Sequence, residues 1–142
     1  MKIKVAQNIQ FKKNTKHIVI SICDDKTFFT PIPKNNCFGA LQLEVIDWDG
    51  PYLRHLFYKG RRVPKNKIFN EHHAKQILNF VNKNLNKIDL IISHCDNEMS
   101  RSSAVAAALS RILNGHEKPF FSFPYRPNYL IYRRLLNEYY NK

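Results

Sequence analysis

Two short and almost wholly apolar runs, residues 17–23 (HIVISIC) and 88–93 (IDLIIS), most constrain what this chain can fold into. Each is flanked by polar clusters, which is typical of a short strand that is buried on both faces. Residues 40–47 (ALQLEVID) instead alternate apolar with polar side chains, and this pattern predicts a strand that is buried on one face. The sequence therefore predicts at least three strands.

Helical patterns separate and follow these strands. In residues 70–86, Asn70 suits an N-cap and apolar side chains recur on one face. A second helix is predicted to begin near Ser100 and to end before Gly115, and a third covers residues 128–140. Alternating strands and helices predict an α/β fold with a central, mostly parallel sheet that is flanked by helices.

The composition is that of a folded, basic protein. Hydrophobic residues make up 44% of the chain, which excludes a disordered one. The length suits one core, so we expect a single domain over residues 1–142. The 23 Lys and Arg against 11 Asp and Glu give a net charge of +12. Such a field attracts phosphorylated proteins, nucleotides or nucleic acids without selecting among them, and an ordinary basic surface is equally compatible with it.

The cysteines and histidines predict no disulfide framework and no metal site. Cys23, Cys37 and Cys95 are odd in number and include no CxxC pair. His72 and His73 are adjacent, so they do not share a helix face. No secretion signal or membrane-length apolar run occurs. We therefore expect a cytoplasmic protein with no cofactor and no membrane association, in which buried thiols are a simpler interpretation of Cys23 and Cys37 than a disulfide with Cys95.

The segment from Cys95 to Arg101 combines a strand end, a short loop and a helix start. Backbone N–H groups at such a helix start favour an anion, and Cys95 would lie at the floor of that cradle. The same donors predict a thiolate with a lowered pKa. Arg101 offers a forked pair of N–H groups to two phosphate oxygens. Together these groups predict phosphoryl transfer through a cysteinyl-phosphate.

The stretch HCDNEMSRSS resembles the phosphate-binding signature of the cysteine-dependent protein tyrosine and dual-specificity phosphatases, and its surroundings resemble small phosphatase-like proteins of bacteria and viruses. The resemblance implies a phosphatase-like domain in which Cys95 attacks phosphorus, Arg101 binds the phosphoryl group and the Ser102 hydroxyl helps the thiolate to leave. It implies that His94 supports the loop. The expected substrate-binding residues are those of the loop: Asp96, Asn97, Glu98, Met99, Ser100 and Arg101.

The same family uses an aspartate on an upstream loop as general acid. Asp47 and Asp49 are the candidates here, because they follow a predicted strand in a turn with Gly and Pro. Asp47 is our first choice, because it matches the acidic position directly after the strand. Either aspartate is also compatible with an ordinary turn residue.

Glu98 departs from the family pattern, which has Gly at the third position after the cysteine. That position tends to require a left-handed backbone, which is strained for Glu, and a carboxylate there would oppose phosphate binding. We expect a phosphatase acting on phosphotyrosine, with phosphoserine and phosphothreonine as further substrates. The alternatives are a non-catalytic phospho-binding protein and an RNA or nucleotide 5′-phosphatase.

The expected partner is a phosphorylated protein or another phosphomonoester. A nucleic acid is the second choice, because exposed aromatic residues such as Tyr125 and Tyr129 accompany the high charge. A basic run with no firm secondary-structure pattern either borders the site or forms a solvated face; it contains Arg54, Arg61, Arg62, Lys65 and Lys67.

Overall fold

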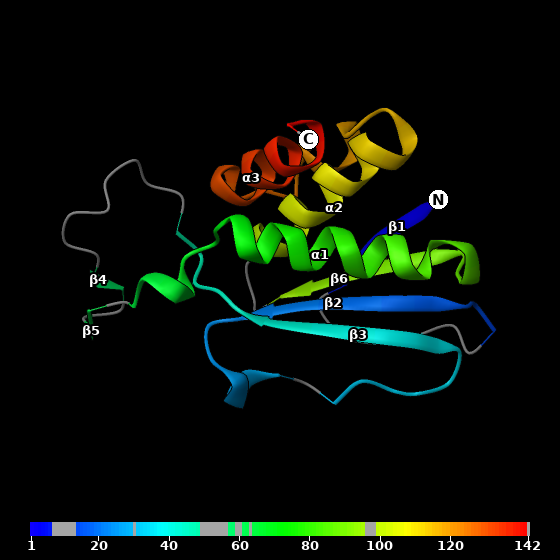
Figure 1. The fold of residues 1–142 in the computed structure, drawn as a ribbon, viewed down its shortest axis with the longest axis horizontal. Coiled ribbons are helices and arrows are strands. Elements are labelled where there is room, and N and C mark those ends of the chain that lie inside the picture. Colours follow the sequence, from blue (N-terminus) through cyan, green and yellow to red (C-terminus); the bar gives the residue numbers. More distant parts are fainter. Residues whose placement is uncertain are drawn as a thin grey trace.

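A parallel sheet forms the centre of the fold. The computed structural model describes residues 1–6, 14–29, 31–48, 57–58, 61–62, 64–95 and 99–141. Four strands pair in the order β1-β6-β2-β3, and each of these pairs is parallel. The strands are β1 (Lys2–Ala6), β2 (His17–Cys23), β3 (Cys37–Glu44) and β6 (Leu90–Cys95). The predicted α/β fold, with a central parallel sheet flanked by helices, is confirmed (Figure 1).

The two central strands are the apolar runs of the sequence. Every residue of β2 is buried, and in β6 only Leu90 is partly exposed. Ile18, Ile20 and Ile22 are fully buried, and burying each such side chain contributes about 1.5–3 kcal/mol. β6 ends at Cys95, so this central strand places the thiol at the carboxyl end of the sheet.

The edge strand β3 lies earlier in the sequence than predicted, ending at Glu44 and not at residue 47. It pairs with β2 as far as Glu44, which is opposite Cys23. The Val45 N–H then donates to the Cys23 carbonyl, and the Ile46 N–H donates to a carbonyl outside the sheet, that of Lys67. The chain therefore leaves the sheet after Val45, where the backbone N–H of Ile46 no longer donates to β2.

β1 was not predicted, although its pattern is that of a strand. Ile3 and Val5 alternate with exposed lysines, and Val5 packs in a small cluster with two alanines of the helix after β6. β1 pairs with β6 along its whole length. Four to five residues of alternation are a weak signal, and the pairing with β6 supplies the rest of the stabilisation.

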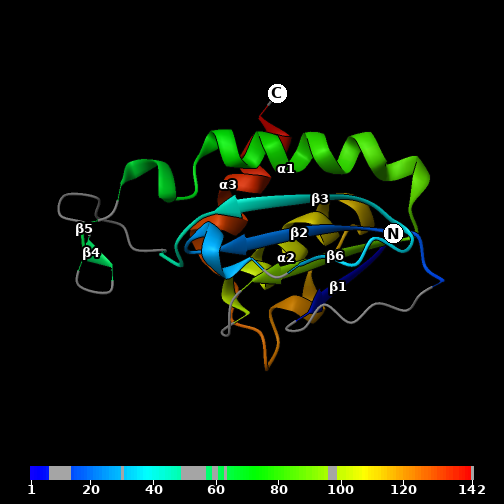
Figure 2. The ribbon, with the colours of Figure 1, turned by 90° about the horizontal axis from the view of Figure 1, so that it is seen from below.

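Three helices lie on one side of the sheet, as Figures 1 and 2 show from two directions. They are α1 (Glu71–Asn84), α2 (Ser100–Asn114) and α3 (Tyr129–Tyr140). α1 contacts β3 and β2, α2 contacts β6 and β1, and α3 packs on both helices. Asn70 caps α1 as predicted, since its side chain accepts from the N–H groups of His72 and His73.

The helix α2 is buried from Arg101 to Ser110. It lies between the sheet and α3, and its small side chains permit the close approach. The fully buried alanines are Ala104, Ala106, Ala107 and Ala108. Gly115 ends the helix in the left-handed conformation, with φ of 81°, as predicted for a C-cap glycine.

The connection from β2 to β3 runs across the face of the sheet opposite the helices (Figure 2). Its first part is the short 3-10 helix η1 (Lys26–Phe28). A separate antiparallel pair, β4 (Phe57–Tyr58) and β5 (Arg61–Arg62), lies at the far left of Figure 1. The remaining 3-10 helices are η2 (Lys65–Lys67), η3 (Leu85–Lys87) and η4 (Lys118–Phe120).

Candidate functional site

The carboxyl ends of the parallel strands and the start of α2 meet at one edge of the sheet, on the left in Figures 1 and 2. Cys95 ends β6 and stands opposite Ile22 of β2. Residues 96–98, which include the expected ligands Asp96, Asn97 and Glu98, lie outside the described residues. The described part of the site consists of the two ends of the loop and the strand ends around it.

The Cys95 thiol contacts the first turn of α2. Its Sγ donates to Ser102 Oγ at 3.0 Å, and the Ser102 backbone N–H donates to the same sulfur at 3.3 Å. Ser102 is fully buried, and only 4% of Cys95 is exposed. The sequence resemblance implied that the Ser102 hydroxyl helps the Cys95 thiolate to leave. The structure places these two side chains in contact.

The predicted direction of the Cys95 pKa is wrong. Burial raises the pKa of the Cys95 thiol, and this effect exceeds the lowering by the Ser102 hydroxyl, by the Ser102 and Arg101 backbone groups and by the Arg101 charge. The sequence indicated the donors around the sulfur but not the degree to which the surrounding strands remove it from water.

Arg101 lies in the first turn of α2, and its guanidinium donates to two acceptors among the described residues. Its Nη1 donates to Asp24 Oδ1 at 2.6 Å and to the Val45 carbonyl at 2.7 Å. The side chains of Arg101 and Asp24 are 6% and 13% exposed. Asp24 directly follows β2 and Val45 directly follows β3, so both acceptors come from the same sheet edge as Cys95.

Asp47 lies beside the end of the loop. Its Oδ1 accepts from Ser100 Oγ at 3.0 Å and from Asn128 Nδ2 at 2.8 Å. The Asn128 backbone N–H also donates to the Ser100 carbonyl. Asp49, the second acid candidate, lies outside the described residues. The structure thus brings one of the two predicted acids next to the predicted loop.

The two described loop residues before Arg101 have different backbones. Met99 is left-handed, with φ of 53°, and is the N-cap of α2 without a side-chain cap hydrogen bond. Ser100 is the first helical residue. The sequence assigned the left-handed position to Glu98, whose conformation is not among those described, so the positive φ at Met99 is a feature that the sequence did not predict.

His94 supports the end of β6 from within the sheet. It is buried, and its Nδ1 lies 3.3 Å from Ser21 Oγ on the neighbouring strand β2. Ser93, the residue before His94 in β6, donates through its hydroxyl to the Ser102 carbonyl at 2.9 Å. These contacts tie β2, β6 and α2 together at the carboxyl end of β6.

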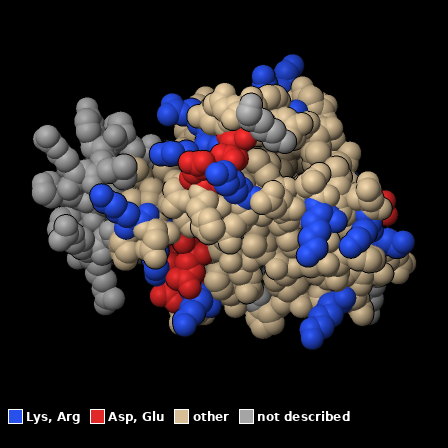
Figure 3. All heavy atoms as spheres, viewed as in Figure 1, with Lys and Arg blue, Asp and Glu red and all other residues tan. Residues whose placement is uncertain are grey.

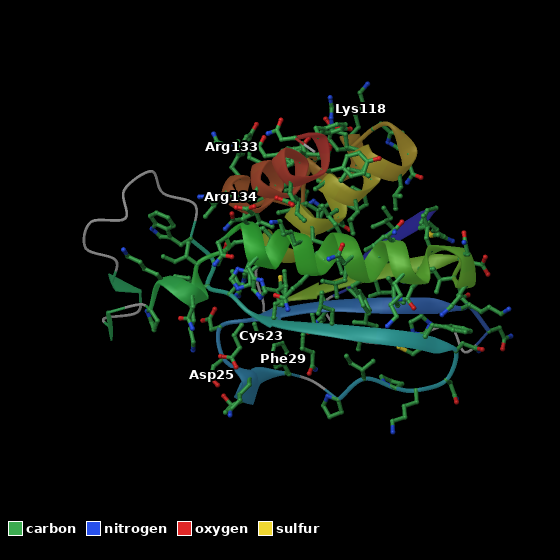
Figure 4. The ribbon with its side chains drawn as sticks, in the orientation of Figure 1. Cys23, Asp25, Phe29, Lys118, Arg133 and Arg134 are labelled. Atoms are coloured by element: carbon green, nitrogen blue, oxygen red, sulfur yellow. The ribbon has the colours of Figure 1, made fainter. Side chains whose placement is uncertain are left out.

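Lys67 pairs with acidic side chains at the carboxyl end of the sheet. Lys67 Nζ lies 3.4 Å from a Glu44 carboxylate oxygen and 3.8 Å from one of Asp25, and it also donates to the Asp24 carbonyl. Of the basic run, Arg54 and the side chains of Arg61 and Arg62 lie outside the described parts, and Lys65 is exposed. Lys67 therefore braces the ends of β2 and β3. Figure 4 labels Cys23, the last residue of β2, and Asp25 just beyond it.

Asp24 and Asn128 are the site residues that the sequence missed. Asp24 stands directly after a buried strand, at the same topological position as Cys95 after β6. Asn128 follows Pro127 and caps α3 through its side chain, which accepts from the Ile131 N–H. An acid at a strand end and an asparagine before a helix were both visible, but only the fold places them against Arg101 and Asp47.

The cysteine pairs weighed from the sequence are not arranged for disulfides. None of Cys23, Cys37 and Cys95 forms a disulfide. Cys23 follows Ile22, the partner of Cys95, so the side chains of Cys23 and Cys95 point to opposite faces. Cys37 begins β3, opposite His17 at the other end of the sheet.

Within the described ranges, no group of three or more His, Cys, Asp and Glu side chains is arranged to hold a metal ion. None of the helices found there is long and apolar enough to cross a membrane.

The fold is similar to that of a known protein. The structure of the human tyrosine phosphatase-like serine/threonine/tyrosine-interacting protein superimposes with a TM-score of 0.53 and 17% sequence identity, covering 88% of this chain and 76% of that one. No protein-family model matches the chain, and no curated protein matches it by sequence. The chain therefore has a phosphatase-like fold.

Proposed function

We propose that this protein hydrolyses phosphomonoesters through a cysteinyl-phosphate on Cys95. One observation carries the proposal: Sγ of Cys95 is hydrogen-bonded to the hydroxyl and to the backbone N–H of Ser102 at the start of α2, next to Arg101. A nucleophile, a helix N-terminus and a cation at one strand end are the parts that phosphoryl transfer requires.

In the first step, the Cys95 thiolate attacks phosphorus and the bond to the leaving oxygen breaks. That oxygen takes a proton from the general acid. In the second step, the carboxylate left by the general acid takes a proton from water, the water oxygen attacks phosphorus, the S–P bond breaks and the sulfur leaves as a thiolate. The Ser102 hydroxyl, 3.0 Å from the sulfur, then rotates to donate to that thiolate. The products are an alcohol or phenol and inorganic phosphate.

For the general acid we propose Asp47 first and Asp49 second. Asp47 touches Ser100, the last residue before Arg101, which supports a position near the bound phosphoryl group. If one of them is the acid, then of the variants Asp47→Asn and Asp49→Asn only one loses the basic limb of the pH–rate profile.

We propose phosphotyrosine, with phosphoserine and phosphothreonine, as the substrate class. The name of the similar structure, a tyrosine phosphatase-like serine/threonine/tyrosine-interacting protein, supports this choice of residues. On the face in Figure 3, Lys and Arg are dispersed among uncharged atoms and do not gather into one stripe. The reduced thiol that the mechanism needs is typical of a cytosolic protein.

A non-catalytic phospho-binding function is the second candidate. One observation favours it: burial raises the pKa of the Cys95 thiol, which lowers the thiolate fraction. This feature is compatible with slow turnover as well as with binding alone.

Hydrolysis of an aryl phosphate separates the two candidates. We expect turnover by the wild type, loss of turnover in Cys95→Ser and Arg101→Ala, and no loss in the matched control Cys37→Ser at the opposite end of the sheet. Phosphopeptide binding without turnover at any pH would contradict the enzyme and favour the binding protein.

A further inference from the structure

Asp24 and Arg101 form a buried ion pair across 77 positions of the chain. Asp24 is carried to Arg101 by β2, which lies next to β6 in the sheet. The side chain of Arg101 is 6% exposed and that of Asp24 is 13% exposed, whereas the side chains of Lys75 and Glu71, an ion pair on α1, are 53% and 66% exposed. A contact of 2.6 Å away from solvent is a strong, charge-assisted hydrogen bond.

Two acceptors fix one end of the Arg101 guanidinium. Nη1 carries two hydrogens, and its two acceptors are Asp24 Oδ1 and the Val45 carbonyl. Because the guanidinium is planar, fixing Nη1 at two points also fixes the direction of the Nε–Nη2 edge. That edge presents two parallel N–H groups, the fork that matches two phosphate oxygens.

We propose that Asp24 is a positioning residue for Arg101: it holds the guanidinium so that the Nε–Nη2 edge binds the phosphoryl group. This inference rests on the proposed function of the Cys95 loop. Asp24 touches neither the nucleophile nor the leaving group, and it acts only through Arg101.

The charge of Asp24 adds to this effect. A buried guanidinium without its carboxylate is poorly solvated and moves toward water or toward another acceptor. A displacement of about 1 Å at a catalytic group lowers a rate by about 10²-fold. Asp24 therefore maintains the cation in the site before substrate arrives.

The adjacent aspartate provides a matched control. Asp25 has the same side chain, but it accepts from the Thr27 N–H and lies near Lys67, with 46% of its side chain exposed. We expect kcat/KM for an aryl phosphate to fall about 10²-fold in Asp24→Ala. In Asp24→Asn, which keeps an acceptor oxygen but loses the charge, we expect a fall of about tenfold. Asp25→Asn should match the wild type.

Coupling to Arg101 distinguishes positioning from a general structural role. In an Arg101→Lys background, where the planar fork is absent, Asp24→Asn should lower kcat/KM less than twofold further. Melting temperatures of Asp24→Asn and Asp25→Asn are compared in parallel. If Asp24→Asn lowers activity equally in both backgrounds, or no more than Asp25→Asn does, the inference is wrong while the proposed function stands.

Binding of inorganic phosphate gives a readout that does not need turnover. Titration calorimetry on Cys95→Ser should give a phosphate affinity that falls about tenfold when Asp24→Asn is added, and not when Asp25→Asn is added. If the wild type hydrolyses nothing but this difference is found, the proposed enzyme is wrong and the role of Asp24 stands. If there is neither turnover nor phosphate binding, both are overturned.

Discussion

The side-chain amide of Asn128 donates to Asp47 Oδ1 at 2.8 Å and so joins the N-terminus of α3 to the segment that follows β3. The same amide donates to the Trp48 carbonyl, and its oxygen caps α3. Ser100 Oγ donates to the same Asp47 oxygen. The start of α2, the candidate acid and the last helix are therefore joined at one point.

We expect Asn128→Ala to lower the free energy of unfolding by about 2 kcal/mol, because it removes a buried cap and the donors to Asp47. Asn128→Ser keeps a capping oxygen but loses the amide donors, so it should lower the free energy of unfolding about half as much as Asn128→Ala does. It should reduce aryl phosphatase activity as strongly as Asn128→Ala does. Urea unfolding and initial rates measure both, with the exposed Asn79→Ala as control. Equal activity in the wild type and Asn128→Ser would contradict a role of this contact in the site.

The Ser102 hydroxyl lowers the pKa of Cys95. Ser102→Ala should therefore raise the midpoint of the thiolate absorbance titration and slow breakdown of the cysteinyl-phosphate by roughly 10²-fold. Ser103→Ala is the matched control, because the Ser103 hydroxyl donates to the Ser100 carbonyl and does not contact the sulfur. If both variants shift the titration equally, the effect belongs to helix packing and not to the Ser102 contact.

The raised pKa of Cys95 predicts how activity depends on pH. In whichever of Asp47→Asn and Asp49→Asn has lost the general acid, only the thiolate titration remains, so kcat/KM of that variant should rise with pH to a value above the ordinary pKa of a cysteine thiol. A profile that is flat from neutral pH upward would contradict the buried, protonated thiol of this structure.

The same shift predicts the pH dependence of stability. The folded state holds the Cys95 proton more tightly than the unfolded state does, so the free energy of unfolding falls as pH rises from the ordinary thiol pKa through the raised one. Unfolding in urea across this range should give a steeper fall for the wild type than for Cys95→Ser. Parallel curves would be inconsistent with a raised folded-state pKa.

His73 predicts a loss of stability in acid. Burial, and secondarily the charge of His72, lower the pKa of His73, and its Nδ1 accepts from the Asn70 N–H in the capping box of α1. The unfolded state binds the proton more tightly, so stability falls as pH drops through the ordinary histidine pKa of about 6.5. His73→Gln supplies an acceptor that does not titrate. Between neutral pH and pH 5, this variant should lose roughly 1 kcal/mol less of its free energy of unfolding than the wild type does. His72→Gln, on the exposed side, removes only the secondary cause and should reduce the loss of stability in acid less than His73→Gln does.

The sequence was sufficient where a pattern is local. The apolar runs predicted β2 and β6, the apolar periodicity and the cap residues predicted α1 and α2, and Cys95 and Arg101 were correctly placed at a strand end and a helix start. Each of these features depends on neighbours within a few positions, for which side-chain periodicity and capping preferences are direct physical constraints.

The rest depends on residues that only the fold brings together. The ion pair of Asp24 with Arg101 and the contact of Asn128 with Asp47 span 77 and 81 positions, so no local pattern announces them. The pKa of Cys95 was predicted in the wrong direction for the same reason, since its burial comes from strands and helices distant in sequence. The roles of Glu98 and Asp49 remain predictions from the sequence.

Trapping the intermediate tests the central claim most directly. Ser102→Ala is mixed with an aryl phosphate, quenched in acid within the first turnover and digested for mass spectrometry. The account predicts one added phosphoryl group on the peptide that contains Cys95, absent from Cys95→Ser/Ser102→Ala treated in the same way. Phenol release with no phosphorylated Cys95 peptide, or the same phosphopeptide in the variant without Cys95, would contradict it.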